Sequence, residues 1–191
     1  MSSYTAAQRL ARAYAFEREI GLAPVYVDAA VSNPSASLAG HGAQHLLATG
    51  LRAADGGEHY GLGSAGVRAL FIAGLFHDAD YTVGAPEDVN IPAAEAYARQ
   101  QMQGTSEEFL THLVVSFIRA TRYPHYTGLR LPEEIIGDAD LLCNIEPDAA
   151  TFHAGLASEG IAVKSDFPSY SDVRTGWARG LLAEHRTAAA A

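Results

Sequence analysis

The chain has 191 residues, of which 48% are hydrophobic and 18% are charged, a balance typical of one globular domain rather than of a disordered chain. Its net charge of −9 and pI of about 5.2 argue against broad binding to nucleic-acid polymers or anionic membranes, because both carry negative charge. With one cysteine, no disulfide within the chain, no secretory signal pattern and no apolar run of membrane-spanning length, we expect a cytoplasmic protein.

The sequence pattern predicts helices joined by loops, with no convincing strand. Thr5 is a good N-cap for the first helix, and Gly21 stands where a C′ glycine belongs. Residues 21–40 are expected to form a loop with one turn near 26–31, and a helix that ends at Asp55-Gly56-Gly57 follows it. The segment 67–78 is apolar on nearly all sides, which is typical of a central, buried helix. We expect helices over 6–20, 40–54, 67–78, 93–102, 106–122, 132–145, 148–158 and 171–184.

These elements predict an all-α protein, a single domain over 1–191 built as a bundle of about seven to nine helices. The motifs described below lie within 40–145. The helices within 148–186 are expected to pack on that core.

Four side chains that can bind a divalent cation lie on three separate helical segments. His77 and Asp78 end the apolar helix, His45 lies on the helix before it, and Asp140 lies between apolar pairs of a later helix. Neighbours on a helix point about 100° apart, but a loosened last turn can let both reach one ion. Imidazole and carboxylate ligands together suit Mn, Fe, Co, Ni or Zn, and less exclusively Mg. The alternative is four unrelated polar residues on the surface or at helix ends.

The sequence around these residues resembles the HD-domain metal-dependent phosphohydrolases, in particular a subgroup of small bacterial proteins. The resemblance covers 40–145 in outline and implies an HD-type helical bundle in which His45, His77, Asp78 and Asp140 hold the ion. Glycines 40 and 42 and Ile91 depart from the pattern of the subgroup. The matching segments are His41-Gly-Ala-Gln-His45, Phe76-His-Asp-Ala-Asp-Tyr81, Asn90 and Asp138-Ala-Asp-Leu141.

Several other groups are candidates for contact with a substrate. Arg119 and Arg122 are three residues apart on one expected helix and can clamp a phosphate; alternatively, they are solvated arginines at a helix end. His41, expected on the same helix face as His45, can touch a phosphate, donate a proton or join a second metal; alternatively, it lies on the surface at a helix start. Asn144, one turn after Asp140, can bind substrate or cap its helix.

Carboxylates beside the predicted ion are candidates for orienting the attacking water or exchanging its proton. Asp78 and Asp80 are assigned this role, whereas Glu87 and Asp88 are interpreted as solvated loop acids. Cys143 is interpreted as a small buried core residue.

The leading hypothesis is a hydrolase that cleaves a phosphate ester of a small metabolite, with a nucleotide as the expected substrate, by attack of metal-activated water. A homodimer is compatible with it. One alternative is a non-catalytic HD module that binds a nucleotide or a partner. Another is a di-iron oxygenase on the same fold, which needs two further histidines, for which His112 and His125 are the candidates.

Overall fold

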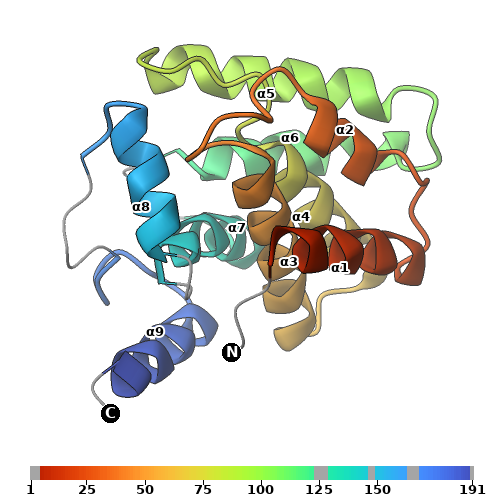
Figure 1. Cartoon of the computed structure of the whole chain (residues 1–191). Helices are drawn as coiled ribbons and strands as arrows, with labels where there is room; N and C mark the ends of the chain where they lie inside the picture. The colour runs from red at the N-terminus through yellow and green to blue at the C-terminus, as the bar shows by residue number, and fades with distance from the viewer. Residues whose placement is uncertain (1–4, 123–128, 146–148, 163–167, 190–191) are drawn as a thin grey trace.

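The computed structural model describes residues 5–122, 129–145, 149–162 and 168–189, and that part of the chain consists of helices joined by turns and loops (Figure 1). It contains nine α-helices and no strand, which confirms the all-α prediction. Two 3-10 helices, Glu108–Leu110 and Cys143–Ile145, precede α6 and follow α7. The helices are α1 (Ala6–Glu19), α2 (Tyr26–Ser32), α3 (Ala43–His59), α4 (Ser64–Phe76), α5 (Glu87–Met102), α6 (Thr111–Ala120), α7 (Leu131–Leu142), α8 (Ala149–Ser158) and α9 (Gly176–Ala189).

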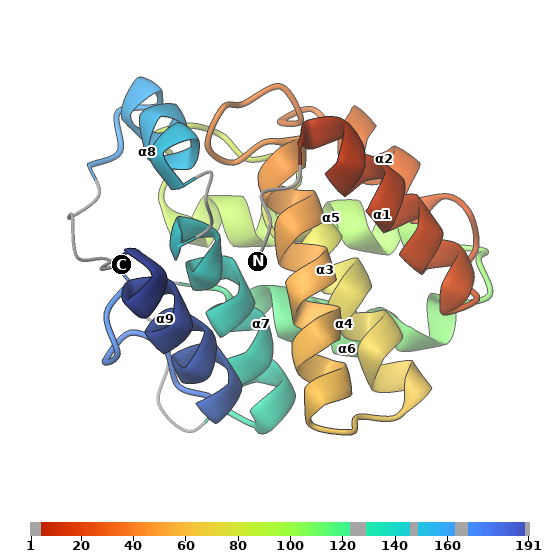
Figure 2. The same ribbon diagram turned by 60° about the horizontal axis from the view of Figure 1, so that its bottom comes forward.

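Helix α4 is the centre of the bundle, as its apolar sequence predicts. It contacts α2, α3, α5, α6 and α7, and every residue from Ala69 to Phe76 is buried. Figure 2 shows α3 and α4 side by side, with α7 on the other flank of α3 and α9 beyond α7. Burial of this apolar surface is the main stabilising contribution in a domain of this size.

Two glycines set the separation of α3 and α4. A Cβ built on Gly74 would lie 2.5 Å from the Gly50 Cα and 2.6 Å from its backbone nitrogen, so the two helices touch backbone to backbone at this level. His45 lies a little over one turn before Gly50, and His77 three residues after Gly74. The contact therefore lies next to both histidines and brings the helix ends that carry them together.

The bounds of α3 differ from the expected ones at both ends. Gly56 does not end the helix but lies inside it. A larger residue would not fit there, because a Cβ would be 2.7 Å from Ile135 of α7 and 3.1 Å from the Trp177 ring. At the other end, Gly42 has an extended backbone and serves as the N-cap, so His41 precedes the helix. Close packing, rather than helix termination, explains the glycine at position 56.

Two further elements begin elsewhere than expected. Helix α5 begins at Glu87, six residues before the expected start, with Pro86 as its N-cap and Pro92 in its second turn. Asn90 is buried in this helix and bonds to the backbone of Thr82 and Ala85. Helix α6 begins at Thr111, five residues after the expected start at 106, and Glu107 before it is buried and accepts a hydrogen bond from the Tyr26 hydroxyl.

The last two helices pack on this core. Helix α8 contacts the 3-10 turn after α7, and α9 contacts α7 and α3. Asp138 is fully buried and accepts hydrogen bonds from the backbone of Arg174 and Thr175, which joins α7 to the segment before α9. Among the described helices, none is long and apolar enough to cross a membrane.

We expect Gly74→Ala to destabilise the protein by about 1–3 kcal/mol or more, because the added methyl group meets backbone atoms that cannot rotate away. It should also weaken divalent-cation binding by separating the two histidines. Urea unfolding and metal titration measure the two effects. Gly180→Ala is the matched control: nothing lies within 4 Å of its Cβ position on α9, so it should be neutral or stabilising. Equal effects of the two substitutions would contradict the role of the glycine contact.

Candidate metal centre

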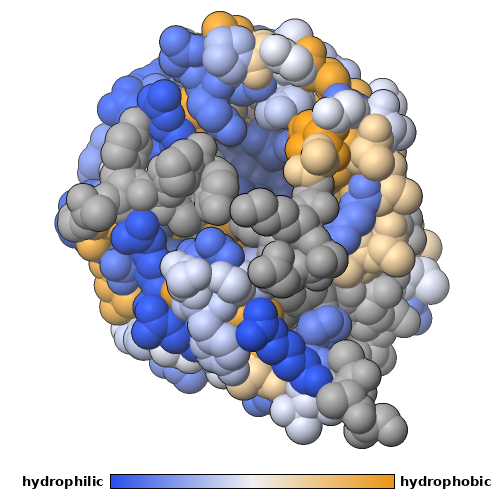
Figure 3. Space-filling view, turned by 90° about the vertical axis from the view of Figure 1, so that its left-hand side faces the viewer, coloured by the Kyte–Doolittle hydropathy of each residue, from blue (hydrophilic) through white to orange (hydrophobic). Residues whose placement is uncertain are grey.

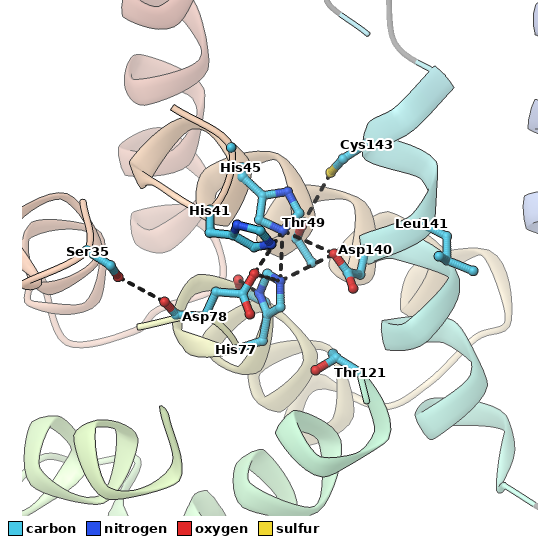
Figure 4. A network of polar contacts seen from close by, with 12 residues as sticks. Ser35, His41, His45, Thr49, His77, Asp78, Thr121, Asp140, Leu141 and Cys143 are labelled. Atoms are coloured by element: carbon cyan, nitrogen blue, oxygen red, sulfur yellow. Dashed lines mark hydrogen bonds and ion pairs between the residues drawn. The ribbon is translucent and has the colours of Figure 1, made fainter. Parts of the chain in front are cut away.

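Four side chains from three helices or their ends converge on one point (Figure 4), and two of them lie close in sequence to Gly50 and Gly74 of the glycine contact. His45 comes from the first turn of α3, His77 caps the C-terminus of α4 and is followed by Asp78, and Asp140 comes from the last turn of α7. The Nε2 atoms of the two histidines are 2.9 Å apart. Asp140 Oδ1 lies 3.1 Å from the Nε2 of His45 and 3.4 Å from that of His77. Asp78 Oδ2 lies 3.3 and 3.1 Å from the same two nitrogens.

These separations suit a shared divalent cation. Two ligands at right angles on an ion with bonds of about 2.1 Å lie about 3 Å apart. His45, His77 and Asp140 each offer one ligand atom, and all three atoms lie within 4.8 Å of one another. Both histidines are buried, whereas Asp78 and Asp140 are 16% and 22% exposed. The group can therefore hold an ion from one side and leave its other side open, whichever of the divalent metals binds.

Hydrogen bonding and packing aim the imidazoles at this point. The Nδ1 of His77 lies 2.9 Å from the carbonyl oxygen of Gly74, to which it can donate, so that the Nε2 lone pair faces the cluster. The ring of His45 is stacked against Phe152 of α8, with centroids 5.1 Å apart and planes 24° apart. Its Nδ1 is buried without a hydrogen-bond partner among the described residues. Both rings are thus fixed before any ligand arrives.

The metal-free cluster holds protons strongly. Burial alone would lower the pKa of His77, but the charges of Asp78 and Asp140 and hydrogen bonds to them raise it to about 10. The pKa of His45 is likewise raised against the effect of burial, by Cys143 and the two carboxylates. Burial would raise the carboxyl pKa values, yet the charge of His77 and hydrogen bonds from both imidazoles lower them. A divalent cation would replace these protons as the positive charge between the carboxylates.

A cavity of about 610 Å³ lies over the open side of the cluster, and a hollow with a hydrophilic floor is visible on the α8 side of the molecule (Figure 3). One wall is apolar and is formed by Phe152, Leu156 and Ile161. The described lining also holds four carboxylates, those of Asp78, Glu87, Asp140 and Asp172. Because like charges would repel an anionic ligand, such a ligand would need a cation in the cavity.

The structure places the candidate substrate-binding residues differently. Arg119 makes two hydrogen bonds to Glu95, of 2.6 and 2.8 Å, is 62% exposed and is not among the cavity residues. Arg122 is not among the cavity residues either, and it lies just beyond the end of α6 at Ala120, so the expected clamp of two arginines is not seen at the cavity. Arg122 is half-buried, and its charge offsets part of the rise in the pKa of Glu87, which does line the cavity.

Of the remaining candidates, His41 and Asn144 line the cavity and Asp80 does not. His41 lines the cavity, with its ring centroid 6.0 Å from that of His45, although it reaches this position from a loop and not from the helix. Asn144 also lines it, but its amide donates to Leu141 O and its oxygen lies 3.1 Å from His153 Nε2. Asp80 is exposed, has a left-handed backbone (φ 61°) and is not a lining residue.

The expectation for Glu87 as a solvated loop acid is corrected by its place at the start of α5, in the cavity wall. Burial, Asp78 and Asp140 together raise its carboxyl pKa, against the charges of His41 and Arg122. Its position as the first residue of α5 could have been read from the sequence only if Pro86 had been recognised as an N-cap. Tyr81, the last residue of the matching segment that begins at Phe76, also lines the cavity. Phe152 and Glu159 take part in the site as well, and no motif in the sequence marks these two. Cys143 is buried, as expected, with its sulfur 3.3 Å from Thr49 Oγ1.

Comparisons with protein-family models, with curated proteins and with solved structures each found no match to this chain. The buried His/His/Asp group is arranged as HD-domain metal sites can be, and this is the part of the resemblance that the geometry supports.

The stabilising effect of His77 in the metal-free protein should depend on pH. Its folded-state pKa of about 10 exceeds the ordinary 6.5, so its contribution is fully present below about pH 6.5 and is lost as the pH rises through about 10. We therefore expect the stability difference between wild type and His77→Gln, measured by urea unfolding with a chelator, to be largest near pH 5.5 and to shrink toward pH 10. A difference that stays constant over this range would contradict the assignment.

Binding of a divalent cation should release protons, because the metal displaces them from the imidazoles. Calorimetric titration of Zn²⁺ or Mn²⁺ in buffers of different ionisation enthalpy would count them. The affinity should rise with pH and should fall by more than about tenfold in His45→Gln. His112→Gln, an exposed histidine on α6, is the control and should bind as wild type does. Binding without proton release would mean that the ion sits elsewhere.

Proposed function

We propose that this protein is a metal-dependent phosphohydrolase, related to the HD-domain enzymes, that cleaves a phosphate ester of a small metabolite. The observation that carries the proposal is the convergence of His45, His77, Asp78 and Asp140, with the two Nε2 atoms 2.9 Å apart, at the floor of a cavity. A ligand set of two imidazoles and two carboxylates leaves positions on an ion for water and substrate, as a catalytic site requires.

A divalent ion in this place would supply an acidified water and positive charge for the phosphoryl oxygens. The protein's own groups would do the rest. His41 and Glu87 face the cavity and can exchange protons with water or the leaving group. The apolar wall formed by Phe152, Leu156 and Ile161 suits the organic part of the ester.

The expected substrate is a small phosphorylated compound such as a nucleotide. The cavity of about 610 Å³ falls within the range of roughly 300–1,000 Å³ usual for small-molecule sites. A nucleic-acid polymer remains a poor candidate, because the net charge of −9 opposes its approach. A cytoplasmic location and a homodimer stay predictions from the sequence.

The alternatives have less support. A di-iron oxygenase would need two further histidines at the site, but His112 is exposed on α6 and is not a lining residue, and His125 lies outside the described residues. A non-catalytic nucleotide-binding module is compatible with the cavity. It does not explain why all four ligands are present and oriented.

We expect the protein to hydrolyse at least one member of a panel of nucleotides and generic phosphate esters when Mn²⁺, Co²⁺, Ni²⁺ or Mg²⁺ is added, and not with a chelator. Asp140→Asn should lower kcat by about 100-fold or more, because it weakens the hold on the charge that stabilises the transition state. Asp88→Asn, an exposed acid on α5, is the control and should retain activity. Binding of nucleotides with no turnover under any metal would favour the non-catalytic module, and turnover intact in Asp140→Asn would refute the mechanism.

A further inference from the structure

Glu159 is a buried carboxylate directed at His41. Its side chain is 5% exposed, and its Oε2 lies 2.6 Å from His41 Nδ1. The other oxygen, Oε1, accepts hydrogen bonds from the backbone N–H groups of Gly40 and His41. Burying a carboxylate costs free energy unless the group is paired. Attachment of a loop to the surface does not by itself require such a group, so we expect Glu159 to have a further role.

Close packing of α8 against the loop before α3 brings this carboxylate to His41. A Cβ on Gly155 of α8 would lie 2.5 Å from the carbonyl group of Ala39, so helix and loop touch backbone to backbone. A Cβ on Gly40 would lie 3.0 Å from both Glu159 oxygens and 2.7 Å from Leu156. Glycine at position 40 departs from the HD subgroup pattern, and the structure explains it by the approach of Glu159.

His41 is held on its other sides as well. Its ring is stacked on that of Tyr81, with centroids 4.0 Å apart and planes 7° apart, and it meets His45 edge-on at 6.0 Å. Figure 4 shows the ring beside His45, on the same side as the metal-binding carboxylates. With Nδ1 occupied by Glu159, the polar atom of His41 that remains for the cavity is Nε2.

We infer that Glu159 is a positioning residue that holds His41 in the Nδ1–H tautomer and presents its Nε2 lone pair to the substrate as a general base. The inference rests on the proposed function for the identity of the reaction. A carboxylate that orients a histidine in this way is a recurring arrangement for activating an attacking group, because it fixes both the ring and the tautomer.

The proton transfers balance within the site. An O–H bond of the attacking water breaks and its proton moves to His41 Nε2, while the water oxygen forms a bond to phosphorus. The phosphorus–oxygen bond to the leaving group breaks, and that oxygen, on the opposite side of phosphorus, takes a proton from water, to which His41 Nε2 then returns the proton that it accepted. His41 is thereby regenerated, and Glu159 keeps its charge throughout.

The substitution Glu159→Gln tests this directly. Its amide oxygen can still accept from the Gly40 N–H, which places the NH₂ group against His41 Nδ1 and reverses that hydrogen bond. We expect His41 to switch to the Nε2–H tautomer, visible in the ¹⁵N shifts of its ring in the Zn²⁺-loaded protein, with the His41 signals identified by their loss in His41→Gln. We also expect kcat to fall by about 100-fold with little change in KM.

A double-substitution cycle separates positioning from general support of the fold. If Glu159 acts through His41, the double variant His41→Gln/Glu159→Gln should be no slower than His41→Gln alone. Glu95→Gln, which removes one partner of the exposed ion pair with Arg119, is the matched control and should leave both kcat and the tautomer of His41 unchanged.

Wild-type protein with His41 in the Nε2–H tautomer, or additive losses in the double variant, would overturn the inference. The wild-type tautomer decides the matter even if Glu159→Gln fails to fold. Absence of hydrolysis for every phosphate ester would instead refute the proposed function, while the tautomer measurement would still report whether Glu159 positions His41.

Discussion

The site depends on the direct backbone contact between α3 and α4 at Gly50 and Gly74. Larger side chains at this level would keep the helix axes farther apart, and the short imidazole side chains of His45 and His77 could not bring their Nε2 atoms to 2.9 Å. Gly74 belongs to the buried stretch of α4 from Ala69 to Phe76. The stability of the core and the geometry of the ligands therefore depend on the same packing.

The cluster beside this contact has little to gain in stability from its charges. Each of the two buried imidazoles lies within 3.4 Å of the other and of two partly exposed carboxylates, and these carboxylates raise the histidine pKa values against the effect of burial. Apolar residues of similar volume would often serve the fold as well or better. Groups that are paired only through protons are suited to exchange those protons for a cation, so the packing that brings them together favours the proposed chemistry.

Helix α8 completes the site from a distant part of the sequence. Phe152 stacks on His45, Leu156 lines the cavity, and Glu159 reaches His41 just beyond the helix end. None of these residues lies in a motif, and each acts through a contact more than 100 residues away along the chain. Such contacts leave no local pattern, because any aromatic or acidic residue at a helix surface has the same appearance in a sequence.

The sequence by itself determined the all-α class, the capped first helix at Thr5, the buried α4 and the residues His45, His77, Asp78 and Asp140 as one group, since helical periodicity and ligand chemistry are local properties. Tertiary structure decided the rest. It placed Gly56 inside a helix, turned Arg119 outward to Glu95, moved Glu87 into the cavity wall and paired His41 with Glu159. Each of these outcomes is set by which surfaces come into contact when the helices pack, and that depends on the shape and charge of partners remote in the chain.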